Sequence, residues 1–70
     1  MSEESKARTL GERIEEIRKE QGISIEDAAS RSGIPVETWS SIESNSVNVK
    51  TRALFDIAFA LDVRPKNLFV

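Results

Sequence analysis

The sequence predicts an all-α fold, a compact bundle of five short helices in one domain. Apolar residues recur at the three- and four-residue spacing of a buried helix face, and nowhere alternate as they do along a strand. Ser or Thr precedes several of these runs, and glycine or proline interrupts them at short intervals. A chain of 70 residues leaves room for one hydrophobic core.

The first helix is predicted to begin at Thr9, because Thr9 and Glu12 have the spacing of a capping box. Residues 1–8 show no apolar periodicity and are expected to form a flexible N-terminal arm, which leaves residues 9–70 as the single domain. Gly22 is a natural left-handed stop for the helix. Its apolar stripe consists of Leu10, Ile14 and Ile17.

Two short helices are expected next, separated by a tight turn. The second helix begins at the Ser24 cap and ends at Gly33. Pro35 presets the backbone for a third helix over residues 36 to 43 or 44, with Trp39 and Ile42 on its apolar side. Asn45 is then expected in the left-handed conformation at the start of a loop.

The last third of the chain predicts two more helices. Residues 50–61 form the fourth, with an apolar face made of Leu54, Ile57, Ala58 and Leu61. The segment at residues 62–65 breaks it, and Pro65 is expected to open a short fifth helix that runs through Phe69.

The composition excludes several kinds of function. The chain has no Cys and no His, so it has neither thiolate nor imidazole metal ligands, and it lacks the usual general base. Neighbouring carboxylates such as Glu12, Glu15 and Glu16 are spaced as a solvated helix face. We therefore expect no enzyme activity, no metal and no other cofactor. With a polar start and no membrane-length apolar run, the chain is expected to be cytoplasmic, without a membrane partner.

Charge is distributed unevenly along the chain. The formal net charge is −2, but residues 21–49 contain only Arg31 against four acidic residues, whereas residues 50–70 contain four basic and two acidic residues. A nucleic-acid contact would therefore draw its positive charge from the two ends of the chain.

The pair of helices over residues 25–44 has the spacing of a helix-turn-helix motif. A small residue, Ala29, stands where the two backbones approach, Gly33 follows at the turn, and Trp39 and Ile42 anchor the second helix. Here the chain resembles the lambda-repressor-like (Cro/Xre-type) helix-turn-helix family, from about residue 10 to residue 69. The resemblance is carried by Leu10 to Ile14, Ile17, Arg18, Gly22, Ile23, Ser24, Ala29, Gly33, Ile34, Thr38 to Glu43, Asn48, Leu54, Ile57, Ala58, Ala60, Leu61, Asn67, Leu68 and Phe69.

The resemblance implies a sequence-specific DNA-binding transcriptional regulator from a bacterium or phage, associated with the nucleoid. Its expected form is a small homodimeric repressor or controller that reads an inverted-repeat operator in double-stranded DNA, with the third helix in the major groove. The implied base-contacting residues are Val36, Glu37, Ser40 and Ser41. The implied phosphate-contacting residues are Ser24, Arg31, Lys50 and Arg52. Arg18 and Glu43 are expected to form a structural ion pair, with two separately solvated charges as the alternative.

The chain also departs from the family pattern. Ile25 stands where the family commonly has a phosphate-binding Gln, and residues 36–44 contain no Arg or Lys to bind guanine. Trp39 replaces a smaller residue and Ala28 a larger one. We interpret this exchange as conserving core volume, with an exposed Trp39 at a binding surface as the alternative.

An apolar patch on the last two helices predicts self-association. Its expected members are Phe55, Phe59, Phe69 and Val70. The alternative is a core that absorbs all four side chains. A second function also stays open: a protein–protein interaction module with weak or lost DNA binding and an unidentified protein partner. The acidic motif segment, Ile25 and the expected exposure of Phe59 favour it.

Overall fold

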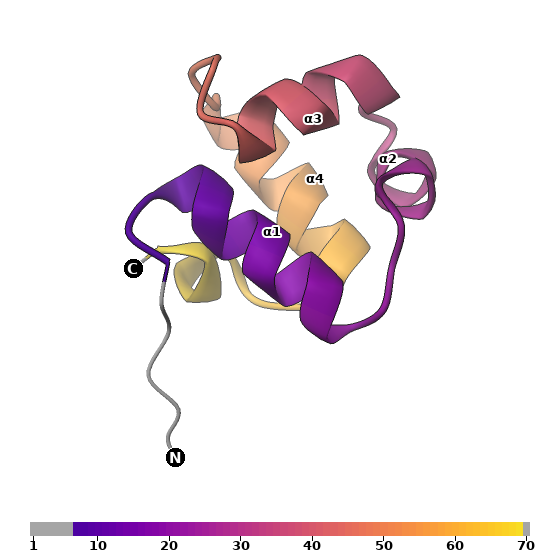
Figure 1. Ribbon diagram of the computed structural model, residues 1–70, viewed down its shortest axis with the longest axis horizontal. Coiled ribbons are helices and arrows are strands. Elements are labelled where there is room, and N and C mark those ends of the chain that lie inside the picture. The colour runs from indigo at the N-terminus through magenta and orange to yellow at the C-terminus, as the bar shows by residue number, and fades with distance from the viewer. Residues whose placement is uncertain (1–6, 70) are drawn as a thin grey trace.

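The computed structural model describes residues 7–69, and these fold into four α-helices and one 3₁₀ turn (Figure 1). Residues 1–6, which make up most of the expected arm, and Val70 lie outside the described residues. In chain order the elements are α1 (Leu10–Glu20), α2 (Ile25–Ser32), α3 (Val36–Glu43), α4 (Thr51–Leu61) and η1 (Pro65–Leu68). Figure 1 shows α1 in front of α4, with α3 across the top of the molecule and α2 at one side.

Local signals mark the limits of the first three helices, with side-chain caps at the starts of α1 and α2 and Pro35 before α3. The Thr9 hydroxyl accepts from the Glu12 amide at 3.2 Å, and the Ser24 hydroxyl accepts from the Asp27 amide at 3.0 Å. The left-handed residues follow the helix ends, with φ of 69° at Gly22, 76° at Gly33 and 62° at Asn45. The sequence-based limits of these helices are thereby confirmed to within a residue.

The prediction of five helices is wrong. The segment after α4 forms only the four-residue 3₁₀ turn η1, in which the Asn67 amide donates to the Arg64 carbonyl at 2.9 Å. The chain becomes extended again at Phe69, so the segment is too short to build an i to i+4 ladder. The start of the fourth helix also differs, because Lys50 is the extended N-cap of α4 and not its first helical residue.

One hydrophobic core lies between the helices and extends to η1. The largest side chains with no more than 2% exposure are Trp39, Ile14, Ile57, Leu61 and Leu68. Leu68 comes from η1, so this turn closes the core although it is not an α-helix. The Arg13 guanidinium donates to the Asn67 carbonyl at 2.9 Å, which ties α1 to the same turn.

Within residues 7–69, no helix combines the length and apolarity needed to cross a membrane. The same part of the chain brings together no group of three or more acidic side chains that could hold a metal ion.

Candidate nucleic-acid interface

The two sides of α3 differ in burial. Trp39, Ile42 and Glu43 are 0%, 3% and 8% exposed, and they face the core. Val36 is 43% exposed, Glu37 and Ser40 are exposed, and Ser41 is half-buried. The four residues expected to contact bases therefore lie on the accessible side of α3, and its anchors lie beneath them.

The turn between α2 and α3 fixes their mutual angle. Gly33 adopts φ of 76°, and its amide donates to the Ala29 carbonyl at 2.9 Å. Ala29 is 4% exposed, as expected for a small residue where two backbones approach. The Ser32 hydroxyl, itself bonded to the Ala29 carbonyl, accepts from the Ile34 amide at 3.1 Å. The amides of Gly33 and Ile34 thus both find local partners, which restrains the corner.

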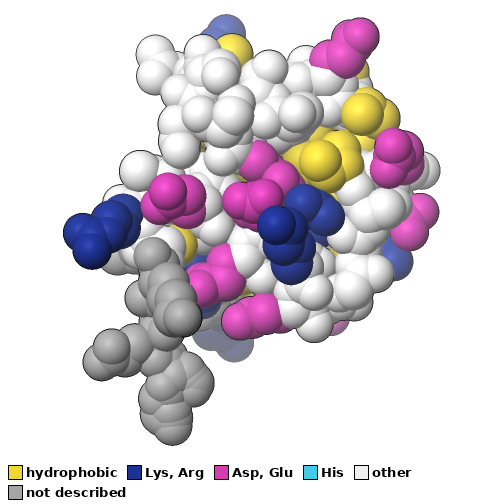
Figure 2. Space-filling view, viewed as in Figure 1, with side chains coloured by type: hydrophobic (Ala, Val, Ile, Leu, Met, Phe, Trp, Pro, Cys, Tyr) yellow, Lys and Arg dark blue, Asp and Glu magenta, His cyan; other side chains and the backbone are white. Residues whose placement is uncertain are grey.

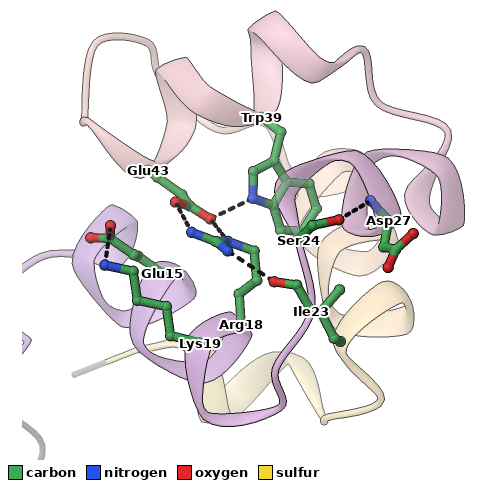
Figure 3. A network of polar contacts seen from close by, with 8 residues as sticks. All are labelled: Glu15, Arg18, Lys19, Ile23, Ser24, Asp27, Trp39 and Glu43. Carbon is green, nitrogen blue, oxygen red and sulfur yellow. Dashed lines mark hydrogen bonds and ion pairs between the residues drawn. The ribbon is translucent and has the colours of Figure 1, made fainter.

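A buried ion pair fastens α3 to α1 (Figure 3). Arg18 of α1 donates from Nε to Glu43 Oε2 at 2.6 Å and from its Nη2 to Oε1 at 3.1 Å. Its remaining nitrogen, Nη1, donates to the Ile23 carbonyl at 2.9 Å, at the entry to α2. Arg18 and Glu43, which the sequence analysis expected to pair, are thus joined by a two-point contact.

Trp39 adds a third donor to the same carboxylate. Its indole Nε1 lies 2.6 Å from Glu43 Oε2, and the ring is completely buried (Figure 3). The preference for a core role of Trp39 over an exposed binding role is confirmed. Ala28 is also fully buried in the same core cluster, consistent with an exchange of volume between the two positions.

These contacts compensate the burial of the two charges. The hydrogen bond to Glu43 raises the pKa of the Arg18 guanidinium, against the opposing effect of burial. Among the described residues, no buried side-chain nitrogen or oxygen lacks a hydrogen-bond partner. A pair satisfied in this way fixes geometry more than it adds stability, because pairing mainly repays the cost of desolvation.

Asn45 makes a second connection between α3 and α1. Its side-chain oxygen accepts from the Gly11 amide at 3.1 Å, and its nitrogen donates to the Thr9 hydroxyl at 2.9 Å. The approach is close, since a Cβ on Gly11 would lie 2.7 Å from the Glu43 carbonyl oxygen and would also clash with the Ile42 carbonyl. The carboxyl end of α3 is therefore held against the amino end of α1.

The residues expected to contact phosphate lie at helix ends. Ser24 is the exposed N-cap of α2, and its hydroxyl keeps a hydrogen to donate after accepting from Asp27. Arg31 is exposed in the last turn of α2. Lys50 and Arg52 are exposed at the start of α4, where no side chain caps the helix and no acidic residue occupies the first turn. Such an end combines two cations with free backbone amides.

The visible face of the molecule carries both signs of charge. Figure 2 shows mainly white atoms over α3 at the top, and below it magenta acidic side chains stand next to dark blue basic ones near the centre and at the left. Ile25, at the position where the family commonly has Gln, packs partly buried against the core. The groups that the start of α2 offers to an anion are therefore its backbone amides and the Ser24 hydroxyl. Residue 25 adds no long polar side chain.

All three phenylalanines of the chain are exposed. Phe55 is 57%, Phe59 78% and Phe69 59% exposed, whereas the core is built from Ile, Leu, Ala and one Trp. Phe55 and Phe59 lie one turn apart on α4, and Phe69 follows η1. Val70, the fourth residue expected in this patch, lies outside the described residues.

Two contacts that position α3 were not predicted from the sequence. The Trp39–Glu43 bond had a signal, since the two residues are four apart on one helix and an indole needs an acceptor when buried. The Asn45 contacts with Thr9 and Gly11 span more than 30 residues, and no local pattern indicates them.

Comparison with known proteins identifies close structural neighbours. The sequence model of the helix-turn-helix family matches residues 14–68. The restriction-modification controller protein C.AhdI from Aeromonas hydrophila superposes with a TM-score of 0.84 at 33% identity, covering 86% of this chain and 91% of that one. No curated protein sequence matches the chain significantly.

A second neighbour is a regulator solved with its ligand. The structure of the master regulator for biofilm formation SinR in complex with DNA has a TM-score of 0.81 at 34% identity, over 86% of this chain and 97% of that one. The N-terminal DNA-binding domain of SinR from Bacillus subtilis has a TM-score of 0.78 at 35% identity, over 84% and 87% of the two chains.

Proposed function

The chain belongs to the Cro/C1-type helix-turn-helix family of DNA-binding transcriptional regulators, and from this membership we propose that it acts as a small homodimeric repressor or controller. In this proposal two copies of α3 read an inverted-repeat operator from the major groove, in half-sites about one helical turn apart. The chain works on DNA in the cytoplasm and catalyses no reaction.

The exposed amino-terminal half of α3 carries this proposal. Val36, Glu37 and Ser40 are accessible on a helix whose other side is pinned by Trp39 and Glu43. A rigid helix with an accessible leading end is what entry into a major groove requires. Among these residues Val36 suits a thymine methyl, Glu37 suits the cytosine amino group, and the hydroxyls of Ser40 and Ser41 suit several base edges.

We assign phosphate contacts to Lys50 and Arg52 at the start of α4, and to Ser24 and Arg31 at the two ends of α2. The Arg52 side chain is 91% exposed and makes a long ion pair with Asp56 at 4.0 Å, so little holds the guanidinium away from DNA. Contacts of this kind supply affinity and salt dependence without reading sequence. Dimerisation through Phe55, Phe59 and Phe69 doubles their number per complex.

The proposal is tested by selecting binding sites from a pool of random duplexes at low and moderate salt. An enriched inverted repeat is the expected result. Lys50→Glu and Arg52→Glu should then weaken binding to all sequences and reduce the salt slope by about one each. Lys19→Glu makes the same charge reversal on α1, where Lys19 pairs with Glu15 at 3.1 Å, and serves as the control.

An interaction module with weak or lost DNA binding is the second candidate. It is favoured by the net charge of −3 over residues 21–49 and by Ile25, which packs on the core where the family commonly has Gln. Failure to retain any duplex at low salt, with the fold intact by circular dichroism, would support this candidate against the regulator.

A further inference from the structure

One carboxylate is the only charge on the accessible side of the proposed reading helix. Residues 36–43 contain two charged residues, and Glu43 is buried beneath Arg18 and Trp39. Glu37 is exposed in the first turn of α3 and makes no ion pair or side-chain hydrogen bond with another described residue. Because no described protein group pairs with this carboxylate, its partner at a DNA surface has to be a hydrogen-bond donor of the DNA.

A carboxylate that enters the major groove needs a hydrogen-bond donor there. It loses water and approaches phosphates of the same charge, which is costly unless a donor replaces the water. Only two base edges present a donor in the major groove, cytosine N4 and adenine N6. Adenine N6 lies between two acceptors that repel a carboxylate, its own N7 and O4 of the paired thymine, whereas cytosine N4 has an acceptor on one side only, O6 of the paired guanine. Glu37 is thus best matched by cytosine.

We propose that Glu37 makes DNA binding by this chain depend on an unmodified cytosine amino group, so that N4-methylation of that cytosine blocks recognition and C5-methylation does not. The inference rests on the proposed function, because it requires α3 in the major groove. One amino hydrogen of cytosine pairs with guanine, and the other is the donor in the groove. A methyl group on N4 of a paired cytosine replaces that second hydrogen.

The C5-methyl group is the matched chemical control. It places a methyl in the same groove, one ring position from N4, but leaves the amino donor intact. Val36, the neighbour of Glu37 at the start of α3, is 43% exposed and offers an apolar contact for such a methyl, as it would for thymine. The two modifications are therefore distinguished by the loss of the donor and not by bulk alone.

The experiment begins with the half-site enriched from unmodified random duplexes. Synthetic duplexes of that sequence then carry cytosine, N4-methylcytosine or 5-methylcytosine at each cytosine position in turn. At one position N4-methylation should weaken binding about tenfold or more, and 5-methylation should change it less than about twofold. Glu37→Ala should bind the unmodified and N4-methylated duplexes equally, because the acceptor is gone.

Glu20→Ala is the protein control. It removes the same charge from an exposed position at the end of α1 and should keep the full N4-methyl effect. The inference is overturned, with the proposed function intact, if the enriched half-site has no required cytosine, if N4-methylation is tolerated at every position, or if its effect persists in Glu37→Ala. A pool from which no sequence is enriched would overturn the proposed function and this inference together.

Discussion

Glu43 is the residue on which the position of α3 depends most. Its carboxylate accepts hydrogen bonds from Arg18 Nε and Trp39 Nε1, each at 2.6 Å. The side chains of the ion pair are at most 10% exposed. Removing the carboxylate leaves a buried guanidinium without its counter-charge and a buried indole without its acceptor. Removing one member of such a pair is far more costly than the net worth of the pair.

Glu43→Ala is therefore expected to lower the free energy of unfolding by about 3–5 kcal/mol. Urea denaturation followed by circular dichroism measures this. Glu15→Ala is the control, because Glu15 pairs with Lys19 on the exposed face of α1 and should cost less than about 1 kcal/mol. Equal losses for the two variants would contradict the role given to the buried pair.

The pair should not act as a pH switch through its arginine. Since the pKa of Arg18 is raised, its contribution to stability is complete below the ordinary pKa of arginine and is lost only as the pH rises through the higher pKa of the folded state. Between about pH 6 and 9, far below that range, we expect no change in the free energy of unfolding from Arg18.

Gly11 is needed for space and not for backbone freedom. An added Cβ would clash with the Ile42 carbonyl and lie 2.7 Å from the Glu43 carbonyl oxygen and from the Asn45 side-chain oxygen. Alanine normally favours a helix over glycine by about 1 kcal/mol, but here the clash separates α1 from α3. Gly11→Ala should destabilise the fold by about 1–3 kcal/mol in urea unfolding. Ser30→Ala, on the exposed face of α2, should be nearly neutral, and a neutral Gly11→Ala would refute the steric explanation.

At the scale of the elements, helix limits were predictable because they depend on neighbouring residues. The caps at Thr9 and Ser24 and the left-handed stops at Gly22 and Gly33 act within a few positions, so the sequence alone locates them. The prediction of a fifth helix was wrong for a related reason. Proline correctly predicted a helical turn at residue 65, but the turn ends at Leu68 because Phe69 returns to extended backbone, with φ of −91° and ψ of 139°, and no local signal in the sequence indicated this.

The exposure of the residues expected to contact DNA was predictable to a similar degree. Periodicity places Trp39 and Ile42 on the apolar face with Val36 at its edge, and leaves Glu37 and Ser40 outside it, and the exposures of these residues follow that division. The contacts that orient α3 were harder to predict from the sequence. Arg18 and Glu43 are 25 residues apart and were paired only by resemblance, and the Asn45 contacts need the folded arrangement of α1 and α3.

The α2–α3 corner gives a prediction at the element scale. Gly33 has φ of 76°, and nothing lies within 4 Å of an added Cβ, so its requirement is conformational only. Gly33→Ala should lower the free energy of unfolding by about 1 kcal/mol, and Gly33→Asn by less, since asparagine tolerates the left-handed region. Urea unfolding of the two variants distinguishes this explanation from a steric one, which would make the larger asparagine the worse substitution.

At the scale of the whole molecule, exposed apolar surface coexists with a complete core. The Cα radius of gyration is 11.0 Å, close to the value of about 11 Å expected for a compact chain of this length. Phe55, Phe59 and Phe69 are thus not left exposed by poor packing of the monomer. A small domain with a thin margin of stability gains from burying such residues against a second copy.

Phe59 is the most exposed of the three, at 78%, and is the residue by which the dimer can be tested. Phe59→Lys places a charge in the proposed interface and should raise the dimer dissociation constant about tenfold or more, because buried aromatic anchors dominate such interfaces. Phe59→Leu keeps an apolar side chain at the same exposed position and should remain dimeric. Sedimentation equilibrium across a concentration series measures the dissociation constants of both variants.

Each monomer alone contributes few phosphate contacts. Phe59→Lys should therefore also weaken operator binding in parallel with the loss of the dimer, while binding to a single half-site stays unchanged. Equal masses for Phe59→Lys and the wild-type protein at every concentration would remove these phenylalanines from the interface.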